Sequence, residues 1–348
     1  MITHKQRVIR AIQGEELDRL PTQISFTPEM SRKVARHLGV SESELFQRLD
    51  NHLIMVSPDD TQRIDEEKLI RYDNWGIGWD MGKLSEGFLI RERPLEKLTL
   101  KEYHPPDPHK ENLFNSAKKV IEKYGKEYFI LSNQGFCLFE KAHCLQGFEK
   151  TLIDLALHRK FIEELLDIIL EYQIAVAKKF VEIGVDGGYT GDDFGGQNGL
   201  LFSPKVWREV FKPRYKKLWD VFKEAGLPVF HHSCGDIREI LPDMIEIGLD
   251  VLNPVQPQAM PIKELSNKYG KNLTFWGGIS VQKTLPFGTR EEVEREVYES
   301  IQVLGRYGKY IIGPSHDMTS DIPLENFDVM VSSIQKYNTL RAKDKLDR

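Results

Sequence analysis

The chain has 348 residues, of which 40% are hydrophobic and 29% charged, with a formal net charge of -5. This balance excludes a disordered or fibrous protein, and an acidic chain with interspersed lysines and arginines argues against a nucleic-acid partner. No apolar run reaches the roughly 20 residues of a membrane span, and the first residues lack a signal-peptide core, so we expect a cytoplasmic protein with no membrane partner.

The first third of the chain alternates short helices and strands. Amphipathic and capping patterns predict helices over residues 3–13 and 30–38, and apolar runs predict strands over 21–26 and 51–57. A segment of different character follows at 72–99, where Asn-Trp-Gly-Ile-Gly-Trp-Asp and later glycines indicate a β-hairpin inserted after the second strand. The insertion is too short to form a domain of its own.

From residue 110 onward, helices and strands alternate regularly. The expected helices cover 110–124, 139–180, 203–225, 237–247, 262–269, 289–307 and 324–342, and the expected strands cover 128–133, 187–194, the stretch around Phe230, 251–255, 274–278 and 310–315. With the two earlier strands, this rhythm predicts the eight strands of an α/β fold, a (β/α)8 TIM barrel, as a single domain over residues 1–348. No Gly-x-Gly-x-x-Gly follows the first strand, which weakens the dinucleotide-binding alternative.

Polar residues fall at the predicted carboxyl ends of the strands, where barrel enzymes carry their chemistry. They are Asn133, Asp192, Asp193, His232, Cys234, Asn253, Gln256 and His316. Single polar residues at strand ends also cap helices, and that interpretation stays open for Asn133 and Asn253. We take Asp193 and Asp192 as candidate catalytic residues, and as candidate substrate-binding residues Asn133, Tyr189, Asn253, Gln256 and Trp75.

A metal site is predicted at the end of the fifth strand. His232 and Cys234 stand two residues apart, so both side chains point the same way, and an imidazole with a thiolate suits zinc. His316 is the third candidate ligand, because no other predicted strand end carries a histidine or cysteine. The alternative is a buried cysteine beside a hydrogen-bonded histidine. With three widely spread cysteines, a disulfide scaffold is not expected.

The neighbouring aspartates have several open roles. Asp192 or Asp193 could be a fourth ligand, a hydrogen-bond partner of a ligating imidazole, or an acceptor for the substrate. Adjacent strand residues point to opposite faces, and Tyr189 shares a face with Asp193, which favours Asp193. The inserted Trp75 and Trp79 would either cover the barrel mouth or pack within the hairpin.

Several motifs in the second half of the chain carry a family resemblance. They are Asp-Asp-Phe-Gly-Gly-Gln, His-His-Ser-Cys-Gly, Ile-Glu-Ile-Gly-Leu-Asp-Val-Leu-Asn-Pro-Val-Gln, Phe-Trp-Gly-Gly-Ile, and Pro-Ser-His with Ile-Pro-Leu-Glu-Asn beyond it. The chain resembles the uroporphyrinogen decarboxylase superfamily over nearly its full length. The resemblance implies a (β/α)8 barrel and either of two activities, decarboxylation in the haem pathway or zinc-dependent methyl transfer in corrinoid pathways.

The two branches differ in the residues that they require. The decarboxylases carry an arginine-rich Met-Arg-Gln-Ala-Gly-Arg motif near the N-terminus, whereas this chain has no arginine between Arg19 and Arg32. The corrinoid methyltransferases carry His-x-Cys-Gly, which His232 to Gly235 match, and a further cysteine ligand near the eighth strand. His316 falls at the place of that cysteine. This departure puts a thiol substrate in doubt, because a metal with one thiolate fewer is more electrophilic.

The resemblance and the residues together favour a zinc-dependent methyltransferase. We expect it to move a methyl group from a methoxylated aromatic compound to the cob(I)alamin of a separate corrinoid protein, as in O-demethylation, since the chain lacks the Asp-x-His-x-x-Gly of a cobalamin module. The alternatives are transfer from methylcobamide to a thiol or tetrahydrofolate, decarboxylation of a smaller acid, and a metal-free binding barrel. A homodimer is left open.

Overall fold

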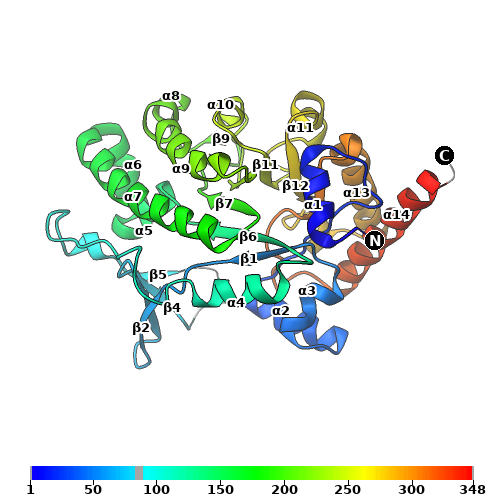
Figure 1. The fold of residues 1–348 in the computed structure, drawn as a ribbon, viewed down its shortest axis with the longest axis horizontal. Coiled ribbons are helices and arrows are strands. Elements are labelled where there is room, and N and C mark those ends of the chain that lie inside the picture. Colours follow the sequence, from blue (N-terminus) through cyan, green and yellow to red (C-terminus); the bar gives the residue numbers. More distant parts are fainter. Residues whose placement is uncertain (1, 83–88, 347–348) are drawn as a thin grey trace.

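The computed structural model describes residues 2–82 and 89–346 of the chain (Figure 1). Within this described part, the main sheet has seven parallel strands, in the order β1 (Leu53–Val56), β6 (Phe129–Gln134), β7 (Gly187–Gly191), β10 (Val229–His232), β11 (Val251–Val255), β12 (Thr274–Ile279) and β13 (Tyr310–Pro314). Each strand pairs with the next in the order, so the carboxyl ends of all seven lie at one rim.

The segment around Thr22 closes this sheet into a barrel. Thr22 forms parallel bridges to Asn51 on one side and to Ile312 on the other. The backbone N–H of Gln23 donates to Ile312 at 2.9 Å, and the N–H of His52 donates to Thr22 at 2.9 Å. The predicted first strand therefore occurs as isolated bridges. With the seven strands of the sheet, this segment closes the barrel, and the predicted TIM-barrel fold is confirmed.

The barrel interior is filled by apolar side chains that point inward from the strands. Phe129, Phe230, Val251 and Ile311 are completely buried there. Helix α1 (His4–Gln13) packs its apolar face against the same cluster, with Val8 fully buried, and so fills the amino-terminal end of the barrel. Each large side chain that is buried in this way contributes roughly 2 kcal/mol to stability.

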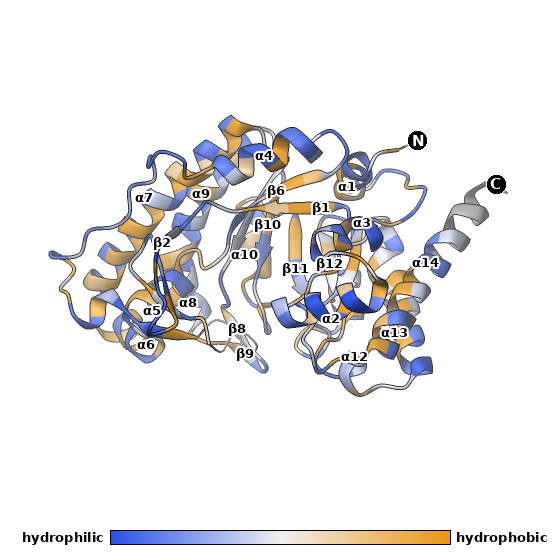
Figure 2. Cartoon of the chain, turned by 90° about the horizontal axis from the view of Figure 1, so that it is seen from below, coloured by the Kyte–Doolittle hydropathy of each residue, from blue (hydrophilic) through white to orange (hydrophobic). Residues whose placement is uncertain are grey.

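Helices cover the outside of the sheet and face water with their other side. Figure 2 shows β1 and β6 as mainly hydrophobic and the visible face of α2 as mainly hydrophilic. The covering helices are α2 (Pro28–Leu38), α3 (Leu45–Arg48), α4 (Asn115–Tyr124), α5 (Phe139–Gln146), α6 (Phe148–Leu157), α7 (Arg159–Ile183), α8 (Pro204–Val206), α9 (Lys212–Glu224), α10 (Leu241–Glu246), α11 (Ile262–Tyr269), α12 (Thr284–Phe287), α13 (Arg290–Val303) and α14 (Leu324–Leu346). No described helix has the length and apolar character that a membrane crossing requires.

One predicted helix is interrupted in the structure. The expected helix over 203–225 divides into α8, a wider π-helical turn at Trp207–Phe211, and α9. Pro213 lies in the first turn of α9 and has no N–H to donate to the preceding turn. The change of helix type at this point follows from that missing donor.

The insertion after β1 differs from the predicted hairpin. Its described residues form a four-stranded antiparallel sheet of β2 (Thr61–Asp65), β3 (Ile70–Asp73), β4 (Gly78–Asp80) and β5 (Ile90–Glu92). It begins at Thr61 rather than at residue 72, and part of the predicted segment, 83–88, lies outside the described residues. β2 is missed from sequence because it is exposed and polar, without the alternation that marks a half-buried strand.

Candidate active site

A cavity of about 680 Å³ opens at the carboxyl rim of the barrel. Its walls include residues at the ends of β6, β7, β10, β11 and β13, together with residues of α5, α7 and the inserted sheet. The predicted site residues that line it are Asn133, Tyr189, Asp193, His232, Asn253 and His316, and Trp75 lines it from the insertion. The tertiary structure therefore brings most of the predicted residues into one space.

Three ligand-type side chains converge at this rim: His232 and His316 line the cavity, and Cys234 lies beside His232. His232, Cys234 and His316 each offer a ligand atom, and these atoms lie within 4.8 Å of one another. The sulfur of Cys234 is 3.5 Å from Nε2 of His232. A tetrahedral zinc with ordinary bond lengths would separate a thiolate sulfur from an imidazole nitrogen by about 3.5 Å. The pair therefore has the spacing that a zinc ion requires.

The tautomer of His232 also suits ligation. Nδ1 of His232 lies 2.9 Å from the side-chain oxygen of Asn253, and the hydroxyl of Tyr189 donates to the same oxygen at 3.1 Å. A carbonyl oxygen only accepts, so Nδ1 carries the proton of the neutral ring. Nε2, on the side of Cys234, is left with a free lone pair. Burial lowers the pKa of His232, which also favours the neutral ring.

His316 fits the metal site less completely in this conformation. Its ring lies edge-on to His232, with centroids 5.4 Å apart. Its Nδ1 accepts a hydrogen bond of 2.8 Å from the backbone N–H of Asp317, which leaves the proton on Nε2. Because the side chain is exposed, a rotation of the ring is sterically open. Ligation by His316 requires that its bond to Asp317 be exchanged for the bond to the metal.

The buried, acidic surroundings of Cys234 favour the binding of a cation. Burial, followed by the neighbouring carboxylates of Asp193 and Glu140, raises the pKa of the Cys234 thiol. Without a positive charge nearby the thiol therefore stays protonated, whereas a bound divalent cation would favour the thiolate. The donor types, the spacing and the negative surroundings all fit a zinc ion.

Asp193 supports the loop that holds the thiol. One of its carboxylate oxygens accepts from the backbone N–H of Cys234 at 2.7 Å and lies 3.6 Å from Nε2 of His232. The next residue of the loop, Gly235, has a φ of +78°, and a Cβ there would collide with the backbone of Gly195. Only glycine fits at this position. The turn that follows the strand therefore places Cys234 beside Asp193.

Asp192 makes its contacts within the protein. Its carboxylate accepts from the backbone N–H groups of Leu138, Phe139 and Glu140 at 2.8 to 2.9 Å and from the hydroxyl of Tyr215. It is completely buried and caps the start of α5. Both of its oxygens accept hydrogen bonds from the protein, and Asp192 is not among the residues that line the cavity. Its catalytic role stays a prediction.

Gln256 also makes its contacts within the protein. Its oxygen accepts from the backbone N–H of Gly235 at 2.9 Å, and its nitrogen donates to Gln282 at 2.7 Å. The side chain is buried and holds the loop that carries Cys234 from behind. Its amide oxygen and one N–H are engaged within the protein, and Gln256 is not among the residues that line the cavity, so its role in substrate binding stays a prediction.

The remaining predicted residues stand at the far wall of the cavity. Asn133 donates to the hydroxyl of Ser57 at 3.2 Å and accepts from the backbone N–H of Gly135 at 3.0 Å. Trp75 is buried and lies edge-to-face against Tyr172, with ring centroids 4.8 Å apart. Trp79 donates from its indole nitrogen to Asp73 at 3.0 Å. Trp75 thus packs against α7, Trp79 bonds within the insertion, and both line the cavity.

Glu140 and Lys141 on α5 are among the charged residues of the cavity that the sequence pattern alone does not single out. Burial, together with the carboxylates of Asp192 and Asp193, raises the pKa of Glu140 well above its ordinary value. The one sequence feature that could have identified these two residues is their position just after the end of the third strand. The neighbouring Cys137 and Cys144 draw more attention in the sequence, but both are buried.

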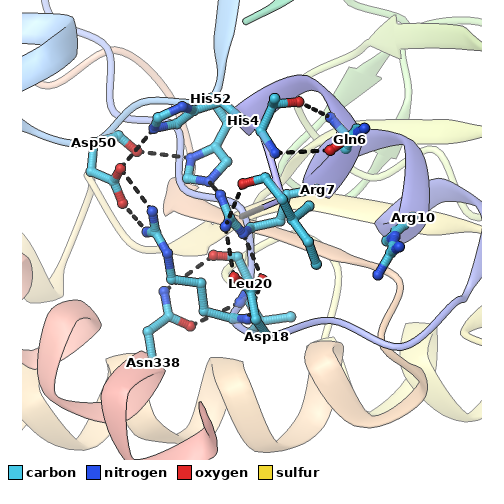
Figure 3. Close-up of polar contacts among 12 residues, drawn as sticks. His4, Gln6, Arg7, Arg10, Asp18, Leu20, Asp50, His52 and Asn338 are labelled. Carbon is cyan, nitrogen blue, oxygen red and sulfur yellow. Dashed lines mark hydrogen bonds and ion pairs between the residues drawn. The ribbon is translucent and has the colours of Figure 1, made fainter. Parts of the chain in front are cut away.

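A second group of metal-ligand residues lies at the opposite end of the barrel. His4, Asp50 and His52 offer ligand atoms within 4.8 Å of one another. Figure 3 shows that guanidinium groups already occupy this cluster: Arg7 bonds Nε2 of His52 at 3.1 Å, and Arg19 pairs with Asp50. Two guanidinium charges repel a cation, so this cluster is a polar network that ties α1 to the start of β1.

Comparison with known proteins places the chain in a family. The family model for uroporphyrinogen decarboxylase (URO-D) matches residues 60–337. A solved structure titled methyltransferase from Methanosarcina mazei shares the fold, with a TM-score of 0.69, 19% identity and coverage of 97% of this chain and 99% of the other. These matches agree with the superfamily resemblance and with the barrel.

Curated relatives come from both activities of the family. The methylcobamide:CoM methyltransferase MtbA of Methanosarcina acetivorans is 22% identical over 345 residues, which cover 96% of this chain and 98% of the relative. A uroporphyrinogen decarboxylase of Thermus thermophilus is 27% identical over 185 residues, which cover 52% of this chain and 49% of the relative. The chain belongs to the uroporphyrinogen decarboxylase (URO-D) family.

Proposed function

We propose that this chain is a corrinoid-dependent methyltransferase that takes a methyl group from a methoxylated aromatic compound and delivers it to the cob(I)alamin of a separate corrinoid protein. The observation that carries the proposal is the convergence of His232, Cys234 and His316 at the carboxyl rim, where His232 and His316 line the cavity. The full-length match to a methylcobamide methyltransferase supports the corrinoid branch of the family.

The ligand set supports an oxygen leaving group. A zinc ion bound here would accept negative charge from the departing oxygen. His316, a neutral imidazole, would donate less charge to that ion than a cysteine thiolate, so the ion would stay more electrophilic. In the reaction, the C–O bond of the methoxy group breaks, the electron pair stays on the oxygen, and a cobalt–carbon bond forms.

The side chains beside the triad suit the departure of that oxygen. Burial and the neighbouring aspartates raise the pKa of Glu140, which favours the protonated form of its carboxyl. It lines the same cavity as His232, and we assign it the donation of a proton to the leaving phenolate. Asp193 holds Cys234 through the backbone and lies close to His232, which makes it a positioning residue in this proposal.

A second candidate is transfer in the other direction, from methylcobamide to a thiol. The name of the Methanosarcina relative favours it, because coenzyme M is a thiol. The same cysteine and histidines would serve, since a zinc ion also lowers the pKa of a bound thiol. The difference between the two candidates lies in the substrate, so the assay must include both.

Decarboxylation of a porphyrinogen is less well supported. The charged residues that line the cavity are mostly acidic, with Asp60, Asp73, Glu140, Asp193 and Asp317 on its walls. A substrate with many carboxylates would be repelled by this surface, because the basic residues among the described lining are few. The apolar and aromatic parts of the same walls suit a small neutral or singly charged ring.

Metal analysis and a two-way assay test the proposal. Purified protein is expected to hold about one zinc per chain, which Cys234→Ala loses and the control Cys144→Ala keeps, because Cys144 is buried away from the cavity. With reduced corrinoid protein and a panel of methoxyarenes, the absorbance should change from cob(I)alamin to methylcobalamin. Protein without metal, or demethylation of methylcobalamin by thiols with no response to any methoxyarene, would overturn it.

A further inference from the structure

Lys141 is a buried cation in the cavity without an anionic partner. The residue is only 8% exposed, yet it lines the cavity from α5. Within residues 2–82 and 89–346, Lys141 makes no side-chain hydrogen bond and no ion pair; its ammonium instead faces the ring of Trp75, whose centroid lies 5.4 Å from the ammonium nitrogen. Its charge is therefore left without a direct counter-ion.

The acids near Lys141 are already engaged. Asp60 pairs with Arg71 at 3.3 Å. Asp73 accepts from the backbone N–H groups of Trp75 and Ile77 and from the indole of Trp79, at 2.9 to 3.0 Å. Neither carboxylate lies within ion-pair distance of Lys141, so its charge interacts with Asp60 and with the adjacent Glu140 only without direct contact.

This arrangement has an energetic cost that points to a ligand. An ammonium that is taken out of water without a counter-ion is destabilised, and a cation–π contact with one ring offsets only part of this penalty. Such a group is stabilised when an anion enters the cavity. Trp75 and Tyr172 beside it both line the cavity and offer aromatic surface for a ring.

We propose that Lys141 binds an anionic substituent of the substrate, which on the proposed function is the carboxylate of a methoxylated aromatic acid. The ring then lies against Trp75, and the methoxy group points toward His232 and Cys234. The contacts along the cavity wall connect the two ends: Glu140 precedes Lys141 on α5, its carboxyl accepts from the backbone of Asp193, and Asp193 lies 3.6 Å from His232.

The same ammonium would also hold the anionic end of a charged thiol, so the probes must separate the two sources. Binding is measured by calorimetry without corrinoid, with 4-methoxybenzoate, its neutral amide 4-methoxybenzamide, and 2-mercaptoethanesulfonate. Lys141→Met keeps the length and removes the charge, Lys141→Arg restores a charge, and Lys178→Met on α7, outside the cavity lining, is the control.

The expected result is that the parent protein prefers the benzoate over the amide by about tenfold or more, in line with one charge-assisted contact. Lys141→Met should lose this preference, Lys141→Arg should recover part of it, and Lys178→Met should keep it. Equal benzoate binding by the parent and Lys141→Met overturns the inference. Binding of the sulfonate that depends on Lys141, with no binding of the benzoate, keeps the anion site but overturns the aromatic acid.

Thermal melting provides a second readout that does not depend on activity. Lys141→Met should unfold at a temperature equal to or above that of the parent, because it removes an unpaired buried charge. Methoxybenzoate should raise the melting temperature of the parent and not that of the variant. A variant that melts much lower than the parent would show that Lys141 is structural and would overturn its role in binding.

Discussion

The side-chain oxygen of Asn253 lies 2.9 Å from Nδ1 of His232 and thereby fixes which ring nitrogen faces Cys234. Asn253→Ala removes this acceptor and frees the ring to rotate or to change tautomer. Loss of such a partner typically weakens metal affinity by about 10- to 100-fold. Zinc affinity, measured by competition with a chromogenic chelator, should fall by this factor in Asn253→Ala.

A matched control for this prediction is Asn133→Ala. Asn133 lines the same cavity but contacts Ser57 and Gly135 and not the metal-ligand residues. Its zinc affinity should equal that of the parent. If both variants lose zinc to the same extent, the effect comes from general loosening of the cavity and not from the orientation of His232.

A second prediction concerns Asp192. Asp192→Ala leaves three backbone N–H groups at the start of α5 and the hydroxyl of Tyr215 without their acceptor. Each unsatisfied buried donor costs about 1 kcal/mol, so with four donors the free energy of unfolding should fall by about 4 kcal/mol. Urea unfolding at pH 7 measures the change.

A conservative variant and a surface control accompany Asp192→Ala. Asp192→Asn keeps one acceptor oxygen and should lose less stability than Asp192→Ala. Asp220→Ala, which removes a surface aspartate paired with Lys216, should change the free energy of unfolding by less than about 1 kcal/mol. An Asp192→Ala protein as stable as the Asp220→Ala protein would contradict the capping role.

The third prediction is a pH dependence at the amino-terminal end of the barrel. The guanidinium of Arg7 donates two hydrogen bonds to Asp18 and lowers the pKa of this carboxyl from 3.8 to about 2. A lowered pKa contributes stability that is fully present above pH 3.8 and is lost as the pH falls through about 2. Because Asp18 is partly exposed, solvent screening limits this contribution to about 1 kcal/mol.

Asp18→Asn removes the titrating group and serves as the test. Urea unfolding midpoints are compared at pH 5 and at the lowest pH where the protein remains folded. The parent should lose more stability over this interval than the variant, and the two curves should converge at the acid end. Parallel curves would show that the pair with Arg7 does not contribute to acid sensitivity.

The order of strands and helices could be predicted from the sequence because it depends on local patterns. Apolar runs such as that before His232 and the glycines that end helices identify each unit, and their repetition predicts the barrel. The closing segment at Thr22 was predicted as a strand, although only isolated bridges form there. The inserted sheet was predicted as a hairpin that begins too late in the chain, because its outer strand β2 is polar and depends on pairing with β3.

The sequence by itself pointed to the His232 and Cys234 pair, because the two ligand-type residues stand two apart at a strand end; β10 stops at His232, and it is the turn at Gly235 that holds Cys234 beside it. Only the tertiary structure decided which residues surround this pair and what they contact. β7 ends at Gly191, so strand alternation no longer applies to Asp192 and Asp193, and the helix start of α5 takes the first of them as its cap. Lys141 becomes noticeable only when folding places it beside Trp75 with its charge unpaired, since partners distant in sequence decide whether a buried charge is compensated.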